Sequence, residues 1–224
     1  MSRPHDEHGS PHADHPPFGP QWWERHYQEY AARHGSPSPQ LVAEVTGLPA
    51  GSALDAGCGH GADALWLARQ GWQVTAVDVS PTAVSDARDF VGHEEPDLAS
   101  HIAWVVADLT TWQPPQQYDL VVSQYVHPAM PFDEFVARLA QAVAPDGTLL
   151  VVGHDHADEH SAAHAPDKAS IDLDAVTGSL AAELWVVDVA ATRTRQIEHG
   201  PTRRSIHDLV VRAHRKPDGN GARA

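Results

Sequence analysis

Two acids and three glycines in the first half of the chain have the types and spacing of a nucleoside-binding site. The run Leu54-Asp55-Ala56-Gly57-Cys58-Gly59-His60-Gly61 is followed, after another strand-like segment, by Asp78. Glycine lacks a Cβ and tolerates positive φ, so the backbone can turn sharply and approach a ligand closely enough for its N–H groups to contact it. A carboxylate about 20 residues further on can accept hydrogen bonds from ribose hydroxyls. The pattern predicts that a cofactor with a nucleoside binds here.

The glycine pattern alone is a weak signal, because tight strand-to-helix turns that bind no ligand use the same residues. The flanking segments strengthen it. Further polar residues follow the other expected strands, at Asp108, Ser123 and His154. Since ligands of open α/β sheets bind beyond the carboxyl ends of the strands, these residues and the two acids point to one site.

The elements that must position these residues alternate along the chain. Strands are expected at 53–56, 73–77, 102–107, 120–123 and 148–153, with helices at 61–70, 81–91 and 132–143 between them. A weak helix over 171–180 and two strands at 184–190 and 206–213 follow, the strands forming an antiparallel pair at one sheet edge. The sequence therefore predicts an α/β fold of the Rossmann-like, doubly wound type. Its seven-stranded sheet would be mostly parallel, with an antiparallel final strand.

Composition divides the chain into one domain and two tails. Residues 1–20 are rich in His and Pro without apolar periodicity, which predicts a disordered tail, and 215–224 is expected to be another. A single domain is expected over 21–214. Within it, residues 21–48 would form an amino-terminal helical lid carrying several aromatic side chains.

The charge and the cysteine count exclude several classes of function. The net charge is −15, so an acidic surface would repel nucleic acid and anionic membranes, and a small-molecule partner is favoured. The single cysteine, Cys58, excludes an intramolecular disulfide and Cys-based zinc sites. No membrane-spanning segment or signal peptide is evident, which predicts a cytoplasmic location. The oligomeric state stays open between monomer and homodimer.

Five motifs resemble those of the class I S-adenosylmethionine-dependent methyltransferases, in order and in spacing. They are LDAGCGHGADALWLA at 54–68, VTAVDVS at 74–80, ADL at 107–109, YDLVVSQYVH at 118–127 and APDGTLLVVGH at 144–154. Together with the WWERHY segment, they are most similar to the small-molecule branch that includes the tellurite-resistance and thiopurine methyltransferases. One departure is Pro145-Asp146-Gly147 where the family usually has Pro-Gly-Gly. Because Asp tolerates turn conformations, no loss of function is expected.

The resemblance implies S-adenosylmethionine as the cofactor and assigns residues to it. Asp55 and the backbone of Gly57, Cys58 and Gly59 would hold the methionine end, and Asp78 would accept from both ribose hydroxyls. Asp108 would accept from the adenine amino group, with Leu109 and Val79 against the ring. Ser123 and Gln124 would face the sulfonium.

Candidate acceptor-side residues come from the amino-terminal helix and from the segments after the fourth and fifth strands. His127 is the candidate general base, because an imidazole titrates near neutrality; the alternative is a loop His that only lines the pocket. The other candidates are Trp22, Trp23, Tyr27, Tyr125 and His154. The aromatic residues of the helix either exclude water and stack on the acceptor, or pin the helix to the core.

Two other functions remain open from the sequence. His156, His160 and His164 recur every four residues and, with His5 to His15, would suit a metal-binding protein if their segment were helical. Pro166 and the polar residues around it favour a loop, so no metal ligand is assigned. Protein methylation is the second alternative.

Overall fold

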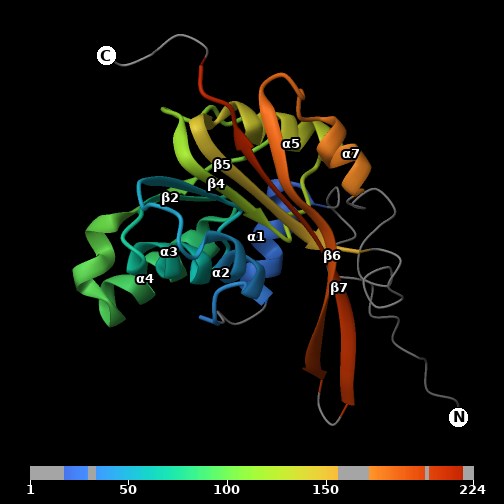
Figure 1. Cartoon of the computed structure of the whole chain (residues 1–224). Helices are drawn as coiled ribbons and strands as arrows, with labels where there is room; N and C mark the ends of the chain where they lie inside the picture. Colours follow the sequence, from blue (N-terminus) through green and yellow to red (C-terminus); the bar gives the residue numbers. More distant parts are fainter. Residues whose placement is uncertain (1–17, 30–33, 156–171, 200–201, 219–224) are drawn as a thin grey trace, which may run out of the picture.

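The structure is a computed structural model that describes residues 18–29, 34–155, 172–199 and 202–218. Within them, seven strands form one sheet in the order β3-β2-β1-β4-β5-β7-β6 (Figure 1). Strands β1 to β5 are parallel, β7 is antiparallel to β5, and β6 is antiparallel to β7. The strands are β1 (Ser52–Ala56), β2 (Gln73–Asp78), β3 (Ile102–Val106), β4 (Tyr118–Gln124), β5 (Val143–His154), β6 (Trp185–His199) and β7 (Thr202–Arg215). The predicted fold class is confirmed.

Helices cover both faces of the sheet because side chains of each strand alternate between the faces. Leu54 and Val121 pack against α5 on one face, whereas their neighbours Ala53 and Leu120 belong to the cluster with α2 and α3 on the other. The helices are α1 (Pro20–Glu29), α2 (Pro39–Val45), α3 (Ala62–Arg69), α4 (Pro81–Glu94), α5 (Phe132–Gln141) and α7 (Leu173–Gly178), with a 3₁₀ helix η1 (Pro96–His101). The sequence analysis did not anticipate η1.

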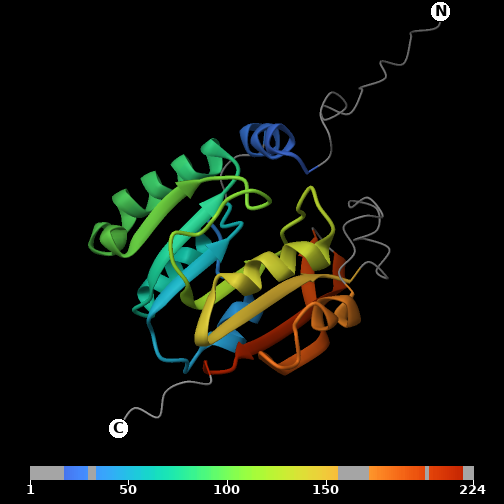
Figure 2. The same ribbon diagram turned by 90° about the horizontal axis from the view of Figure 1, so that it is seen from above.

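Helix α1 stands apart from the two layers and lies beside α4, near the amino end of that helix (Figure 2). With α2, it falls within the helical segment expected over 21–48, of which residues 30–33 lie outside the described residues. Helix α4 begins where Ser80 caps it, since the Ser80 hydroxyl accepts from the Ala83 N–H at 3.1 Å and Pro81 occupies the first turn. The cap follows Asp78 directly and so fixes the end of β2.

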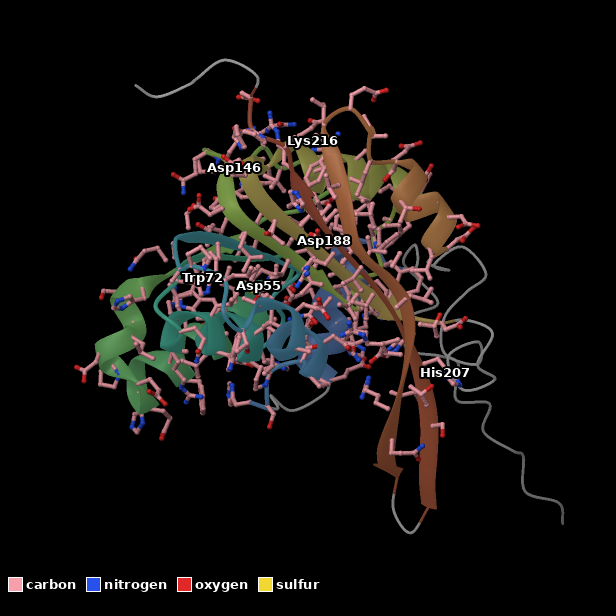
Figure 3. All side chains as sticks on the ribbon, in the orientation of Figure 1. Asp55, Trp72, Asp146, Asp188, His207 and Lys216 are labelled. Carbon is pink, nitrogen blue, oxygen red and sulfur yellow. The ribbon has the colours of Figure 1, made fainter. Side chains whose placement is uncertain are left out.

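The carboxyl-terminal hairpin is much longer than predicted. The strands were expected at 184–190 and 206–213, but β6 and β7 pair from Trp185↔Arg215 to His199↔Thr202, with a register shift between Val187 and Val189. Only 208–214 of β7 also pairs with β5, so the outer part of the hairpin is a two-stranded ribbon that leaves the sheet, with His207 on it (Figure 3). Cross-strand contacts such as Gln196 to Ser205 at 2.7 Å stabilise polar residues in strands, which composition alone does not reveal.

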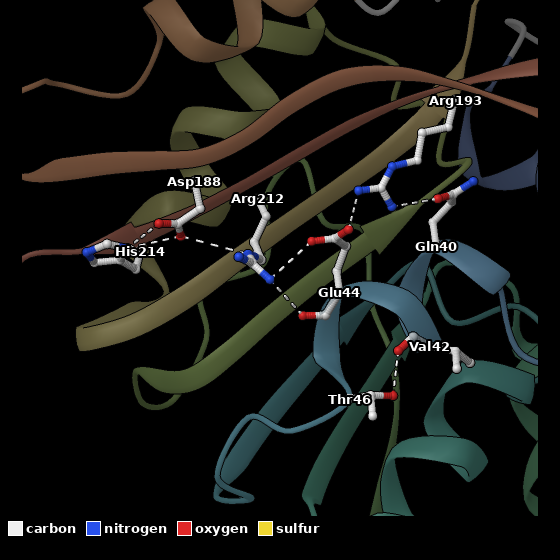
Figure 4. Close-up of polar contacts among 8 residues, drawn as sticks. All are labelled: Gln40, Val42, Glu44, Thr46, Asp188, Arg193, Arg212 and His214. Atoms are coloured by element: carbon white, nitrogen blue, oxygen red, sulfur yellow. Dashed lines mark hydrogen bonds and ion pairs between the residues drawn. The ribbon is translucent and has the colours of Figure 1, made fainter.

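A chain of charged side chains holds this hairpin to α2 (Figure 4). Glu44, with a side chain only 7% exposed, accepts from Arg193 and lies 3.1 Å from Arg212. Asp188 lies 3.8 Å from Arg212 on the far side and 3.0 Å from His214. The chain thereby joins an element near the amino terminus to the last two strands.

Candidate active site

A cavity of about 240 Å³ lies where the carboxyl ends of β2, β3 and β4 meet α1. In an open sheet, ligands bind at the point where the strand order reverses, which here lies between β1 and β4. The lining of the cavity includes ten of the residues predicted for the site, namely Gly57, Asp78, Val79, Asp108, Leu109, Gln124, Trp23, Tyr27, Tyr125 and His127. We call it the main cavity.

The glycine turn allows close approach but does not offer free N–H donors. Gly57 has φ +88° and a Cβ there would overlap the Val126 side chain, while Gly59 has φ +49° and lies under the Tyr27 hydroxyl. The N–H groups of Gly57 and Cys58 both donate to the Val77 carbonyl, and that of Gly59 donates to Asp78 at 2.9 Å. The end of β2 thus already binds these three N–H groups, and the contact of this backbone with a ligand stays a prediction.

Asp78 and Asp108 present carboxylates to the main cavity. Asp78 accepts from the Gly59 and Ser80 N–H groups at 2.9 and 3.0 Å, and burial raises its pKa against the effect of these hydrogen bonds. Asp108 accepts from the N–H and hydroxyl of Thr110 through Oδ1. Each carboxylate is thus oriented by backbone donors and retains lone pairs for a ligand.

A second cavity, of about 390 Å³, lies on the other side of the glycine turn and shares Tyr27, Gly57, Gln124 and Tyr125 with the main cavity. Asp63 lines it and accepts from the Ser38 N–H at 2.7 Å and from Gln124 Nε2 at 2.6 Å. Beside it, Asp55 is 2% exposed, and its Oδ2 has no hydrogen-bond partner among the described residues. Burial, then repulsion from Asp63 and Asp78, raises the pKa of Asp55. An unpaired buried acceptor of this kind suits a cationic or donor group of a ligand.

Aromatic rings close the main cavity on the side of α1. Trp23 and His127 face each other with planes 7° from parallel and centres 6.4 Å apart. Phe18 lies 5.2 Å from the His127 ring and 6.1 Å from Trp23, and Tyr27 lies 6.1 Å from Trp23. Phe18 was placed in the tail at 1–20, although it is the only Phe, Trp or Tyr of that segment.

Helix α1 is held in place by one acid that the sequence analysis did not single out. Glu24 accepts from the Ser80 and Thr82 hydroxyls, each at 2.6 Å, and from the Thr82 N–H at 3.2 Å. Burial raises the pKa of Glu24, but these hydrogen bonds and one from Gln28 outweigh it and lower the pKa overall. A carboxylate at the amino end of α4 is also favoured by the helix dipole.

Four residues predicted for the site do not line either cavity, namely the buried Asp55 described above, Trp22, Ser123 and His154. Trp22 packs edge-on against Trp23 with ring centres 4.8 Å apart, and Ser123 is buried within β4. His154 stacks on the outer side of Tyr125, with ring centres 4.5 Å apart, and its Nδ1 lies 3.5 Å from Asp208. Asp208 is fully buried and also accepts from Arg195, at 2.7 Å. His154 therefore packs against the Tyr125 ring and lines neither cavity.

Cys58 is positioned as a packing residue. It is 8% exposed, and burial, with Asp55 and Asp78 nearby, raises the pKa of its thiol. A thiol that stays protonated is a poor nucleophile. Its place between two glycines leaves its backbone as the part closest to a ligand.

Comparison with known proteins agrees with this geometry. The family model of the methyltransferase domain matches residues 53–147. A trans-aconitate 2-methyltransferase of Rhizobium meliloti (strain 1021) is 36% identical over 143 residues, which cover 62% of this chain and 52% of the relative. The chain thus spans about half the length of the curated relatives it matches.

Two solved structures share the fold. The structure from work on the conversion of a disulfide bond into a thioacetal group during echinomycin biosynthesis superimposes with a TM-score of 0.66 at 26% identity, covering 88% of this chain and 93% of that one. TehB from Haemophilus influenzae superimposes with a TM-score of 0.65 at 15% identity, covering 88% and 66%. Residues 53–147 are thus similar to the methyltransferase domain, and the fold is the one seen in these solved structures.

The residues present fit an S-adenosyl group. Asp78 and Asp108 offer acceptors for ribose and for an amino group, and Gly57, whose missing Cβ leaves space for the Val126 side chain, lines the same cavity. The unpaired Oδ2 of Asp55, beside Asp63, suits the ammonium of the amino-acid end. The acceptor groups on the two sides of the glycine turn thus match the two ends of one ligand.

Proposed function

We propose that this chain transfers a methyl group from S-adenosylmethionine to a heteroatom, S, Se, Te, N or O, of a small molecule. The proposal rests on one observation above all. The main cavity joins the acids that suit an adenosyl group to a wall of aromatic side chains and one imidazole. The domain proposed for this activity is 21–214, with 21–48 as its lid.

The residues of the cavity act mainly by positioning the reactants. When bound, S-adenosylmethionine supplies a methyl group on a positively charged sulfur. Asp78 and Asp108 orient the nucleoside, and the rings of Trp23 and Tyr27 exclude water from the reacting atoms. Holding an acceptor in line with the methyl group is the largest contribution such a site can make, since the leaving group needs no proton.

His127 is our proposed general base. It lines the main cavity after β4 and stacks against Trp23, so an acceptor between the aromatic wall and the sulfonium lies within its reach. A base is required only if the acceptor carries a proton on its nucleophilic atom, as phenols and N–H heterocycles do. Soft thiolate, selenide and telluride acceptors need none.

The acceptor differs from that named for the R. meliloti relative. Trans-aconitate is a tricarboxylate, and no Lys or Arg is among the described residues that line the main cavity. Its charged lining residues are Asp78 and Asp108, which would repel such an anion. We therefore propose a different small acceptor.

The two alternatives receive less support. No group of three or more His, Cys, Asp and Glu in the described part of the chain is placed to hold a metal ion, while His5 to His15 and His156 to His164 lie outside that part. A protein substrate is disfavoured because the matched relatives carry the names of small-molecule methyltransferases.

Location and assembly remain proposals. None of the described helices has the length and apolar character needed to cross a bilayer. We propose a cytoplasmic monomer or homodimer that binds neither nucleic acid nor membranes, in keeping with the net charge of −15.

A coupled assay that detects homocysteine after cleavage of S-adenosylhomocysteine tests the activity directly. The purified chain is supplied with S-adenosylmethionine and a panel of thiols, selenite, tellurite, phenols and N-heterocycles. We expect acceptor-dependent release for at least one class, and loss of at least tenfold in kcat for His127→Ala if that acceptor carries a proton. Release at the rate of the acceptor-free control for every class would contradict the proposal.

A further inference from the structure

We propose that the acceptor is a planar, uncharged aromatic or heteroaromatic ring that carries the nucleophilic heteroatom, and that Phe18, Trp23 and His127 hold it. This inference rests on the proposed function. It specifies the class of small molecule that the main cavity selects.

The first argument is the orientation of the rings. The planes of Phe18, Trp23 and His127 lie within 35° of one another, with centres 5.2 to 6.4 Å apart, and all three rings line the main cavity. Aromatic side chains prefer offset-stacked or edge-on partners at centre distances of about 4.5–7 Å. A flat ring can therefore contact several of these walls at once, whereas an aliphatic chain would leave much of their surface unmatched.

The second argument is the charge of the lining. The main cavity offers the carboxylates of Asp78 and Asp108, and no Lys or Arg among the described residues that line it. An anionic ring would be repelled and would lose its hydration without an ion pair in return. A protonated ammonium would suit the carboxylates but lacks the lone pair that must attack the methyl group. A neutral ring is not repelled by the carboxylates, and its heteroatom keeps the lone pair that attacks the methyl group.

The third argument is backbone strain. The described residues contain three non-glycine positions with positive φ, at Phe18, Tyr125 and Asp146, and the first two line the main cavity. Such conformations cost about 1–3 kcal/mol each and persist where the surroundings impose them, commonly at ligand sites. The ring of Phe18 lies 5.2 Å from that of His127, so one of the strained residues belongs to the group of rings described above.

The rings and the adenine-binding residues come from different elements. Val79, Asp108 and Leu109 follow β2 and β3, whereas Phe18 precedes α1, Trp23 lies in α1 and His127 lies in the segment after β4. The acceptor heteroatom would form its bond to the methyl carbon while the methyl–sulfur electron pair stays on sulfur. The proton of the heteroatom leaves to the His127 imidazole.

The test compares two ring probes that differ in charge. Calorimetry measures the binding of 4-hydroxyquinoline and of 4-hydroxyquinoline-2-carboxylate to protein saturated with S-adenosylhomocysteine, so the adenine site is already filled. We expect the neutral ring to bind at least tenfold more tightly than its carboxylate, with trans-aconitate weaker still. Equal or tighter binding of the carboxylate probes, or no binding of the neutral ring to the saturated protein, would overturn the inference. Failure of S-adenosylhomocysteine itself to bind is a different result, because it refutes the proposed function.

Variants assign the effect to the rings. Trp23→Leu and Phe18→Leu are each expected to weaken 4-hydroxyquinoline binding at least tenfold and to leave the Kd for S-adenosylhomocysteine within about threefold. Trp112→Leu is the matched control, because Trp112 lines a cavity beside α5 that shares only Leu109 with the main cavity, and the change should alter neither value. If the control weakens the ring probe as much as Trp23→Leu does, the aromatic wall is not the binding surface.

Discussion

At the residue scale, the least expected feature is the pair of acids beneath the glycine turn. Asp55 was predicted from its motif, but Asp63 stands in the first turn of α3 and carries no motif signal of its own. Burial raises the pKa of Asp63 to about 6, although the N–H of Ser38 opposes the shift. Asp63 accepts from Ser38 and Gln124, whereas the Oδ2 atom of Asp55 has no partner among the described residues. The tertiary contacts of Ser38 and Gln124 create this site, and sequence spacing cannot reveal them.

The raised pKa of Asp63 predicts a pH-dependent effect on stability. An acid whose pKa is higher in the folded than in the unfolded chain destabilises the fold at neutral pH, and the penalty disappears as the pH falls from about 6 towards 4. Asp63→Asn should therefore be more stable than wild type at pH 7.5, and the difference should shrink towards pH 4. The amide can still accept from Ser38, and Gln124 can turn its otherwise unpaired Oε1 towards the new donor. Urea unfolding at several pH values measures this, and a pH-independent difference would show that folding does not raise the pKa of Asp63.

At the element scale, Glu24 joins α1, the proposed lid, to the amino end of α4. The aromatic stripe of this helix was visible in the sequence, but its partner helix was not, because the contact joins residues 56 to 58 positions apart. The same limit applies to the hairpin, where cross-strand pairing extends β6 and β7 into the polar residues between the two predicted strands. Local patterns predicted which elements exist, whereas the long-range contacts decide their length and placement.

Replacing Glu24 should loosen the lid without unfolding the domain. In Glu24→Ala, α1 loses its hydrogen bonds to Ser80 and Thr82, so amide hydrogen exchange over 21–29 should accelerate at least tenfold. The affinity for S-adenosylhomocysteine should fall severalfold, since Tyr27 covers the glycine turn. Glu29→Ala, on the exposed end of the same helix, serves as the control for helix propensity. Unchanged exchange in Glu24→Ala would show that other contacts hold the lid.

At the scale of the whole molecule, the ion pairs between α2 and the β6–β7 hairpin connect the two ends of the domain. Glu44 lies between Arg193 and Arg212, and its carboxylate is almost fully buried. Because removing one partner leaves two partly exposed guanidinium groups facing an amide, Glu44→Gln should lower the free energy of unfolding by roughly 1–3 kcal/mol. Glu95→Gln, which removes the exposed partner of Arg69, should cost less than about 1 kcal/mol. Equal losses in urea unfolding would contradict a structural role for the buried network.

The overall architecture was the part most accessible from sequence. The alternation of strands and helices, the acids at strand ends and the closing antiparallel pair each depend on local patterns, and the sheet order follows from the parallel connections between them. The residues on the acceptor side of the cavity were harder to predict from the sequence. Phe18 stands in a segment without periodicity, and His154, predicted to contact the acceptor, stacks on Tyr125 without lining either cavity.

The central claim is that the cavity holds the nucleoside of S-adenosylmethionine through Asp78. Isothermal titration with S-adenosylhomocysteine should show one site per chain for wild type, and Asp78→Asn should weaken binding about 10- to 100-fold through loss of charge-assisted hydrogen bonds. Asp119→Asn, the same change at the opposite end of the sheet where Asp119 binds Ser52, should leave the affinity within about threefold. Absence of binding to the folded wild-type protein, or equal affinity of the Asp78 and Asp119 variants, would contradict this account.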